Sequence, residues 1–424
     1  MSNDQKPNSL FKKAALALSA VGPGLFLIGY NIGTGSITTM AMAGAQYSMT
    51  LLWALLLSGI FTYVLMVAYG HLSLVTGNTA LYNFKTQIPV VGQALAIYVL
   101  LTMIFTELFA LLSIMGIVSE LIQEGFRLVI APGSAEHVIG TVPIITVIAL
   151  GMFFALWFGQ YKMFERILTT FVILLVFCFV FVFFMISPSY TEIFAGMVPG
   201  IPNDPNAYRI VAAMAGTTCS AVVFIMRSIV VAEKGWDITK LKHEKRDAFV
   251  SVFLMVFLSA VVMAVGAGTL HVMGLTMENT LEMIHLLEPI GGRFAAFILI
   301  IGVAGAGIST MFPILLIAPW LLADYLGWER DVKSPMFRIC IVIGLIIAFG
   351  SVFMSQPPPV IMVIAMALMA FILPAVAIPI YYLLNKKDLI GKEEHMPSKA
   401  WNAGLIAVIL FSFLTSYFAV RGFM

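Results

Sequence analysis

The stretch Gly29-Tyr-Asn-Ile-Gly-Thr-Gly-Ser-Ile-Thr-Thr39 interrupts a long apolar segment with glycines and hydroxyl side chains. Each glycine lowers helix propensity by roughly 1 kcal/mol relative to alanine, and the polar side chains can bond backbone groups that an unwound helix releases. The pattern predicts a helix that unwinds part-way across a membrane. Unwound backbone is tolerated there only where it is buried in protein or lines a cavity, so the break indicates a binding site. The alternative is close helix packing at the small-residue pair Gly29 and Gly33.

The composition indicates a polytopic membrane protein. Of the 424 residues, 61% are hydrophobic and only 10% are charged, and the mean hydropathy is +1.02, which excludes a soluble globular protein. We expect one transmembrane domain over residues 1–424, embedded in the lipid bilayer of the cell membrane and acting as a monomer. The net charge of +2 gives no reason to expect a nucleic acid partner. The three cysteines have neither disulfide nor zinc spacing, and we expect no cofactor and no enzymatic activity.

Apolar runs of about 20 residues predict eleven membrane helices. Their bounds are 14–45, 48–76, 91–123, 141–158, 164–187, 207–232, 248–272, 292–323, 336–354, 359–384 and 401–421. With a cytoplasmic N-terminus, most of the 23 Lys and Arg residues fall on the inner side, and the outer segments carry only Arg127, Arg209, Arg293 and Arg421. The positive-inside rule therefore places the N-terminus in the cytoplasm and the C-terminus outside. The N-terminal segment lacks a small-residue cleavage site, so no removable signal peptide is expected.

A second interruption lies in the sixth predicted span, at Ala215-Gly-Thr-Thr-Cys-Ser-Ala221, and at about the depth of the first. Paired interruptions at corresponding positions of two halves are typical of inverted repeats with a substrate site at the shared midplane. We therefore predict repeat one at about 14–187, repeat two at about 207–384 and an extra helix at 401–421.

Broken helices can bind ions through backbone groups and hydroxyls. Half-helices that begin near Gly35 and Ser220 would present N–H groups and positive dipole ends, which suit a carboxylate. Half-helices that end near Ile32 and Thr217 would present free carbonyls, which suit a cation. The predicted substrate-binding residues lie in these two breaks and are Gly33, Thr34, Gly35, Ser36, Thr217, Thr218 and Ser220.

Ionisable residues at membrane depth are few and are candidates for ion coupling. Glu107 lies near the middle of the third span, where burial penalises its ionised form, so it could carry a proton; the alternative is a fixed pair with an arginine. Arg227 either lines the inner path or is that partner, and we favour the pair. Ser309 and Thr310, in a glycine-rich span, could bind sodium, although helix packing explains them as well. The choice between H⁺ and Na⁺ stays open.

Six segments between Gly22 and Gly391 resemble one known family. They are Gly22-Pro23, the first break, Gly44-Ala-Gln-Tyr47, Leu51-Leu-Trp-Ala-Leu-Leu-Leu-Ser58, Leu373-Pro-Ala-Val-Ala-Ile-Pro379 and Lys387-Asp-Leu-Ile-Gly391. The family is Nramp, the divalent metal transporters. The resemblance implies an all-α polytopic membrane protein with the LeuT-like fold of the APC superfamily, a 5+5 inverted repeat plus an eleventh helix, and proton-linked uptake of metal ions.

The side chains that bind metal in that family are largely missing here. The family's first break carries Asp-Pro-Gly-Asn and its sixth helix carries Met-Pro-His, and the resemblance places Gly33-Thr-Gly-Ser36 and Ser220-Ala-Val222 at those positions. Three further family positions are changed: a histidine is Arg227, a glutamine is Ile372, and a second acid of the third helix is Ala110. Neutral hydroxyls and carbonyls are weak ligands for a divalent ion, so the metal ligands stay unknown.

The sequence thus predicts an Nramp-related secondary active transporter that works by alternating access. Its first candidate substrate is a metal cation, bound weakly or largely hydrated at an atypical site. The alternative substrate is a small carboxylate-bearing organic solute such as an amino acid, because Gly33-Thr-Gly-Ser36 is similar to the glycine-rich break of amino-acid transporters. A third possibility is a non-transporting sensor on the same fold, against which the retained helix breaks argue.

Overall fold

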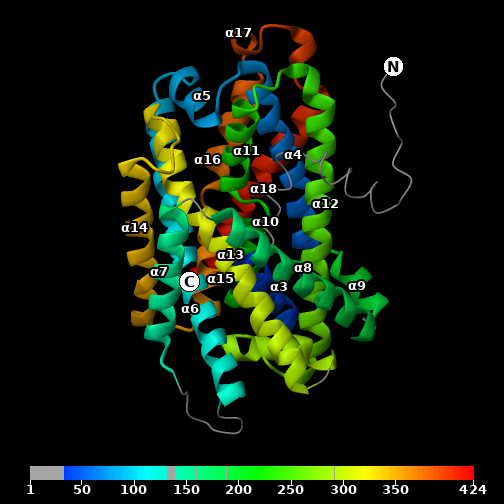
Figure 1. Ribbon diagram of the computed structural model, residues 1–424. Helices are drawn as coiled ribbons and strands as arrows, with labels where there is room; N and C mark the ends of the chain where they lie inside the picture. Colours follow the sequence, from blue (N-terminus) through cyan, green and yellow to red (C-terminus); the bar gives the residue numbers. More distant parts are fainter. Residues whose placement is uncertain (1–32, 131–138, 159–160, 187–188, 291) are drawn as a thin grey trace, which may run out of the picture.

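The computed structural model describes residues 33–130, 139–158, 161–186, 189–290 and 292–424, and these residues form helices and connecting turns without a strand (Figure 1). The longer helices are α3 (Thr34–Tyr47), α4 (Leu52–Thr76), α6 (Gly92–Ile130), α7 (Thr141–Trp157), α8 (Tyr161–Ile186), α10 (Pro205–Thr218), α11 (Ala221–Glu233), α12 (Leu241–Gly266), α13 (Gly292–Leu326), α14 (Pro335–Phe349), α15 (Pro358–Met369), α16 (Leu373–Leu384) and α18 (Lys399–Phe423). The short helices are α5 (Ala80–Gln87), α9 (Tyr190–Gly196) and α17 (Lys387–Ile390). A π-helical turn, Ala267–His271, continues α12, and four 3₁₀ segments lie at Ile238–Lys240, Thr280–Ile290, Gly350–Phe353 and Glu393–His395.

The helices are long and apolar enough for a multi-pass membrane protein. Within the described part of the chain, eight segments qualify as membrane spans, and they coincide with the predicted spans two, three and six to eleven. The predicted fourth span is the shorter apolar helix α7, and the predicted fifth span lies in α8. Residues 14–32 of the first predicted span, with Gly29 and Ile32, lie outside the described residues. The predicted all-α membrane class is confirmed, while the total of eleven spans stays a prediction.

Two of the predicted half-helix starts are present. α3 begins at Thr34 after an extended Gly33, and α11 begins at Ala221 after an extended Ser220. α10 ends at Thr218, so Cys219 and Ser220 divide the span Pro205–Glu233 nearly in half. Glycine and hydroxyl residues therefore mark these helix ends as the sequence predicted.

The tenth span contains a further break that the sequence analysis missed. Residues 359–384 were expected to form one helix, whereas α15 ends at Met369 and α16 begins at Leu373. Pro374 explains the break, because its ring lacks an N–H and would clash with the carbonyl of Ala370 in a continuous helix. The hydroxyl of Ser416 on α18 donates to that Ala370 carbonyl at 3.0 Å, which satisfies the released acceptor.

The helices α3, α10 and α15 contact one another near the centre of the bundle, and α3 also contacts α13 there (Figure 1). Gly216 allows α10 to approach α15 closely, since a Cβ at this position would lie 1.9 Å from the backbone oxygen of Met366. Gly44 does the same for α3 on α12, where a Cβ would lie 2.0 Å from the oxygen of Met263. Small residues thus set the helix spacing around the central junction, as is usual for membrane helices.

Candidate functional site

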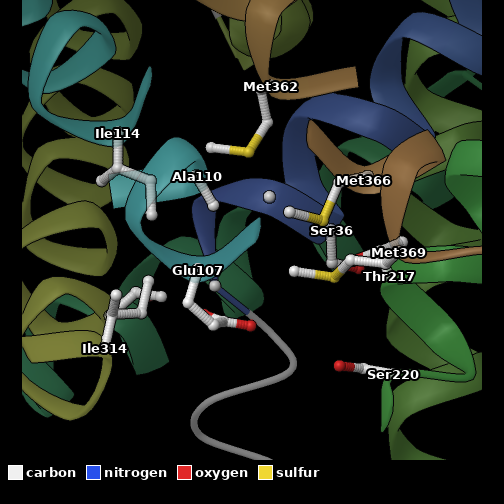
Figure 2. A pocket seen from close by; sticks show the side chains of 13 residues that line it. Ser36, Glu107, Ala110, Ile114, Thr217, Ser220, Ile314, Met362, Met366 and Met369 are labelled. Atoms are coloured by element: carbon white, nitrogen blue, oxygen red, sulfur yellow. The ribbon is translucent and has the colours of Figure 1, made fainter. Parts of the chain in front are cut away.

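A small cavity lies at the junction of the broken helices, between α3, α6, the α10/α11 break, α13 and α15 (Figure 2). Its volume is about 30 Å³, which is room for an ion or about two water molecules. The described residues that line it are Gly33, Gly35, Ser36, Glu107, Ala110, Ile114, Thr217, Ser220, Thr310, Ile314, Met362, Met366 and Met369.

Most of the predicted site residues line this cavity, and both predicted breaks contribute to it. They are Gly33, Gly35, Ser36, Thr217, Ser220, Glu107 and Thr310. Ser220 precedes α11, and its buried hydroxyl has no hydrogen-bond partner among the described residues. Figure 2 shows this hydroxyl directed into the cavity. The Ser36 hydroxyl forms a hydrogen bond of 3.2 Å with Ser259 on α12, and Thr310 donates to the Ala306 carbonyl at 2.8 Å. Of the three hydroxyls of Ser36, Ser220 and Thr310, that of Ser220 is the one without a hydrogen-bond partner in the described part of the chain.

Three other predicted residues lie beside the cavity and do not line it. The Thr34 hydroxyl faces α13, where it lies 3.1 Å from the position a Cβ on Gly307 would take. Thr218 is buried, and its carbonyl accepts a hydrogen bond of 2.9 Å from the Thr62 hydroxyl of α4. Ser309 is half-buried on α13. These residues support the walls of the site.

Arg227 lies away from the cavity, and the expected pairing with Glu107 is wrong. Its guanidinium instead binds two carboxylates of α12, with 2.6 Å between Nε and Glu244 Oε1 and 2.6 Å between Nη1 and Asp247 Oδ2. All three side chains are buried. Gly70 on α4 makes room for this cluster, because a Cβ there would lie 2.0 Å from Glu244 Oε1. The connection between α11 and α12 is short, because α11 ends at Glu233 and α12 begins at Leu241, and it brings these charges together.

The sequence analysis also missed three methionines of α15. Met362, Met366 and Met369 line the cavity and are at most 6% exposed. Figure 2 shows their sulfur atoms directed into the cavity. The sulfurs of Met362 and Met366 each lie 3.4 Å from the position a Cβ on Gly35 would take, so they are no further apart than twice that distance. Spacing of four and three residues on one helix face was the signal that could have found them.

The cavity carries little charge. Among the described lining residues, Glu107 is the one ionisable side chain, and it is 2% exposed. It projects from α6, and Figure 2 shows its carboxylate directed toward the side where Ser220 lies. The described residues contain no group of three or more His, Cys, Asp or Glu that could hold a metal ion. A cation in this cavity would therefore meet one carboxylate, three thioethers, and hydroxyl and backbone oxygens.

Comparison with known proteins gives the family. The family model described as "Natural resistance-associated macrophage protein-like" matches residues 24–421. The chain belongs to the Nramp family. The divalent metal cation transporter MntH of Erwinia tasmaniensis is 21% identical to this Nramp protein over 412 residues, which cover 96% of this chain and 95% of the relative.

Solved structures give the same fold. A single-residue mutant of the manganese transporter of Eremococcus coleocola has a TM-score of 0.69 to this Nramp protein at 14% identity, covering 100% of this chain and 90% of that one. MhsT in complex with L-phenylalanine has a TM-score of 0.60 at 15% identity, covering 93% of this chain and 97% of that one. The predicted family and the LeuT-like fold are confirmed, and the bounds of the two repeats stay a prediction.

Proposed function

We propose that this Nramp protein is a secondary active transporter that moves a metal cation across the cell membrane by alternating access. The observation that carries the proposal is the cavity at the helix breaks, which has a volume of about 30 Å³ and contains one carboxylate. An ion fits this space. An amino acid or other organic carboxylate would have to displace the methionine side chains, so the alternative substrate is disfavoured.

The relatives support a metal substrate at the level of the family. The curated relative from Erwinia tasmaniensis is named a divalent metal cation transporter, and the Eremococcus coleocola structure is a manganese transporter. MhsT, which binds L-phenylalanine in its structure, shares the fold alone, and one fold can serve several substrates. For this chain, the small volume of the cavity favours a metal ion over an organic carboxylate as the substrate.

Glu107 is proposed to couple the transport of metal to that of a proton. Its carboxylate lines the cavity, so a bound cation and a proton compete for the same oxygen atoms. Ionised Glu107 binds the cation, and acidification protonates Glu107 and releases it. The affinity for metal should therefore fall as the pH falls. Thr310 remains a candidate sodium ligand, because it lines the cavity and its hydroxyl, which donates to the Ala306 carbonyl, keeps oxygen lone pairs that can bind a cation.

Thermal unfolding of the purified protein tests the substrate class, because a ligand that binds the native state raises its apparent stability. We expect stabilisation by a metal ion and none by amino acids or small carboxylates. In the Glu107→Gln variant the stabilisation should shrink and its pH dependence should disappear. Stabilisation by an organic carboxylate alone would overturn the proposal, and an unchanged pH dependence in Glu107→Gln would remove the coupling role.

A further inference from the structure

We infer that the cavity selects a soft, monovalent metal cation of the Cu(I) type, through the thioether sulfurs of Met362, Met366 and Met369. This inference rests on the proposed transport function and specifies its substrate. It departs from the divalent ions that the named relatives carry. Four observations support it: the thioether donor atoms, the single ionisable group among the described lining residues, the small volume of the cavity, and the Ser220 hydroxyl without a partner in the described part of the chain.

The donor atoms are soft. Thioether sulfur favours Cu(I), whereas carboxylate, carbonyl and water oxygens favour Mg²⁺, Ca²⁺ and Mn²⁺. Three thioethers line one small cavity, and two of their sulfurs approach the same point beside Gly35 at 3.4 Å. Because Gly35 has no side chain, no side chain of α3 separates these two sulfurs from the cavity at this position. Methionine side chains have three rotatable bonds, so the small movements needed to reach bonding distance are inexpensive.

The charge of the site matches one positive charge. Thioethers are neutral, and Glu107 is the one ionisable group among the described lining residues. The one negative charge that ionised Glu107 carries is equal and opposite to that of a monovalent cation. A divalent cation would keep an uncompensated positive charge in a buried site, which is costly. Arg227, with its two carboxylates, is occupied elsewhere and adds no charge to the cavity.

The space also disfavours a hydrated divalent ion. Mg²⁺ keeps several of its waters, and Ca²⁺ takes six to eight oxygen ligands. The cavity holds about two waters, and its apolar lining includes Ala110, Ile114 and Ile314. Cu(I) needs few ligands and can be bound without water. Three sulfurs, with the Glu107 carboxylate or the Ser220 hydroxyl as a further donor, would complete such a site.

Packing alone is the alternative explanation of the methionines, since methionine commonly fills irregular gaps in cores. Packing does not account for the other features. A gap-filling role would leave no cavity between the side chains, yet the sulfurs border an open volume. It also gives no reason for the Ser220 hydroxyl, which is buried and has no partner in the described part of the chain, to point at the same volume.

The experiment measures binding of Ag⁺, a redox-stable probe for Cu(I), to the purified full-length chain in chloride-free buffer by titration calorimetry. The test variant is Met362→Leu/Met366→Leu/Met369→Leu, in which each exchange keeps the volume and typically costs under about 1.5 kcal/mol. Met263→Leu is the matched control, because Met263 is equally buried on α12 and does not line the cavity. Cys219→Ala controls for silver bound by the buried thiol in the α10/α11 break.

We expect the wild-type chain to bind one Ag⁺ at this site and the triple variant to bind it about 100-fold more weakly, the scale of loss for an important metal-site side chain. Both controls should bind like wild type, and Mn²⁺ should bind more weakly than Ag⁺. If the triple variant proves unstable, Met366→Leu alone should still weaken binding at least tenfold.

Silver binding that is equal in the triple variant and the controls would overturn the inference. Tighter binding of Mn²⁺ than of Ag⁺ by wild type would also overturn it, while leaving the proposed metal transport intact. A wild-type chain that binds neither ion, but does bind an amino acid, would overturn both the inference and the proposed function.

Discussion

The two glycines at the start of α3 have different roles, one in helix packing and the other in the binding cavity. A Cβ on Gly33 would lie 2.4 Å from the Oγ1 atom and 2.8 Å from the Cγ2 atom of Thr310. A Cβ on Gly35 would instead meet the flexible side chains of Met362 and Met366, with both sulfurs at 3.4 Å, an ordinary contact distance. Gly33 is therefore needed for the close packing of α3 on α13, whereas Gly35 keeps the cavity open.

The variants Gly33→Ala and Gly35→Ala should therefore separate stability from binding. Gly33→Ala forces the β-branched Thr310 to move and should destabilise the protein by about 1–3 kcal/mol, the usual cost of overpacking. Gly35→Ala should unfold close to wild type but bind Ag⁺ at least tenfold more weakly, because its methyl group occupies the space between two sulfurs. Thermal unfolding and calorimetry of both variants measure the two effects. The reverse pattern would show that Gly35, and not Gly33, is the packing residue.

The close contact between position 33 and Thr310 also limits the replacement of Gly33 by aspartate, the residue expected there from the family resemblance. Gly33→Asp alone would bring its Cβ against Thr310, so we expect misfolding or weak expression and no gain of Mn²⁺ binding. Gly33→Asp combined with Thr310→Ala removes the two closest atoms, and Mn²⁺ stabilisation in a thermal-shift assay is expected only there. Strong Mn²⁺ binding by the single variant would show that α3 can move away from α13.

At the scale of elements, the junction between α11 and α12 depends on one buried arginine. Arg227 is fully buried and neutralises part of the charge of Glu244 and Asp247, which are also buried. The Arg227 Nη2 atom also donates to the Glu244 carbonyl at 3.5 Å. Removing one partner from a buried ion pair typically costs about 3–5 kcal/mol, because the remaining charge is desolvated. This cluster therefore connects α11 to α12.

Arg227→Met should lower the yield of monodisperse protein and the unfolding temperature sharply. Arg227→Met/Glu244→Gln/Asp247→Asn should recover much of the loss, since neutral groups of similar size replace the whole cluster. Lys387→Met is the control: its pair with Glu393 lies on the surface, with side-chain exposures of 76% and 88%, so the effect should be small. If Arg227→Met is as stable as the control, the cluster does not hold the two helices.

The sequence predicted the helices and helix breaks that depend on neighbouring residues in the chain. The break before α11 follows from Gly216, Thr217 and Ser220, and long apolar runs must be helical because lipid offers no hydrogen bonds to the backbone. The break after α15 had a weaker signal, Pro374 within an apolar run. The role of Met366 was not predictable in the same way. Methionine fills cores everywhere, and the face of α15 that meets the cavity depends on tertiary packing, including the close approach of Gly216 to the Met366 backbone.

At the scale of the whole molecule, ion pairs at the end predicted to face the cytoplasm connect α11 to α13. Arg330 follows α13 and binds Glu233, the last residue of α11, as well as Asp324 near the end of α13 with 2.6 Å between Nη2 and Oδ1. At the opposite end, Tyr47 of α3 donates to Asp204 at the start of α10. The α10/α11 span is thus held at both ends, and the proposed alternating-access cycle would require each connection to be released in turn.

Glu233→Gln should therefore favour opening at the end where α11 and α13 are joined, because it removes the Arg330–Glu233 pair and leaves Arg330 bound to Asp324. The pair is partly exposed, with side-chain exposures of 23% for Arg330 and 53% for Glu233, so its loss is worth at most about 1 kcal/mol, or roughly a fivefold change in population. The rate at which a membrane-impermeant thiol reagent labels Thr217→Cys from that side, in a chain without other cysteines, reports the opening. We expect a rate two- to fivefold above that of Lys387→Gln, whose pair with Glu393 is fully on the surface and joins no two spans. Equal rates would mean that Arg330 orders its own loop and that the closure of this end depends on buried contacts such as those of Arg227.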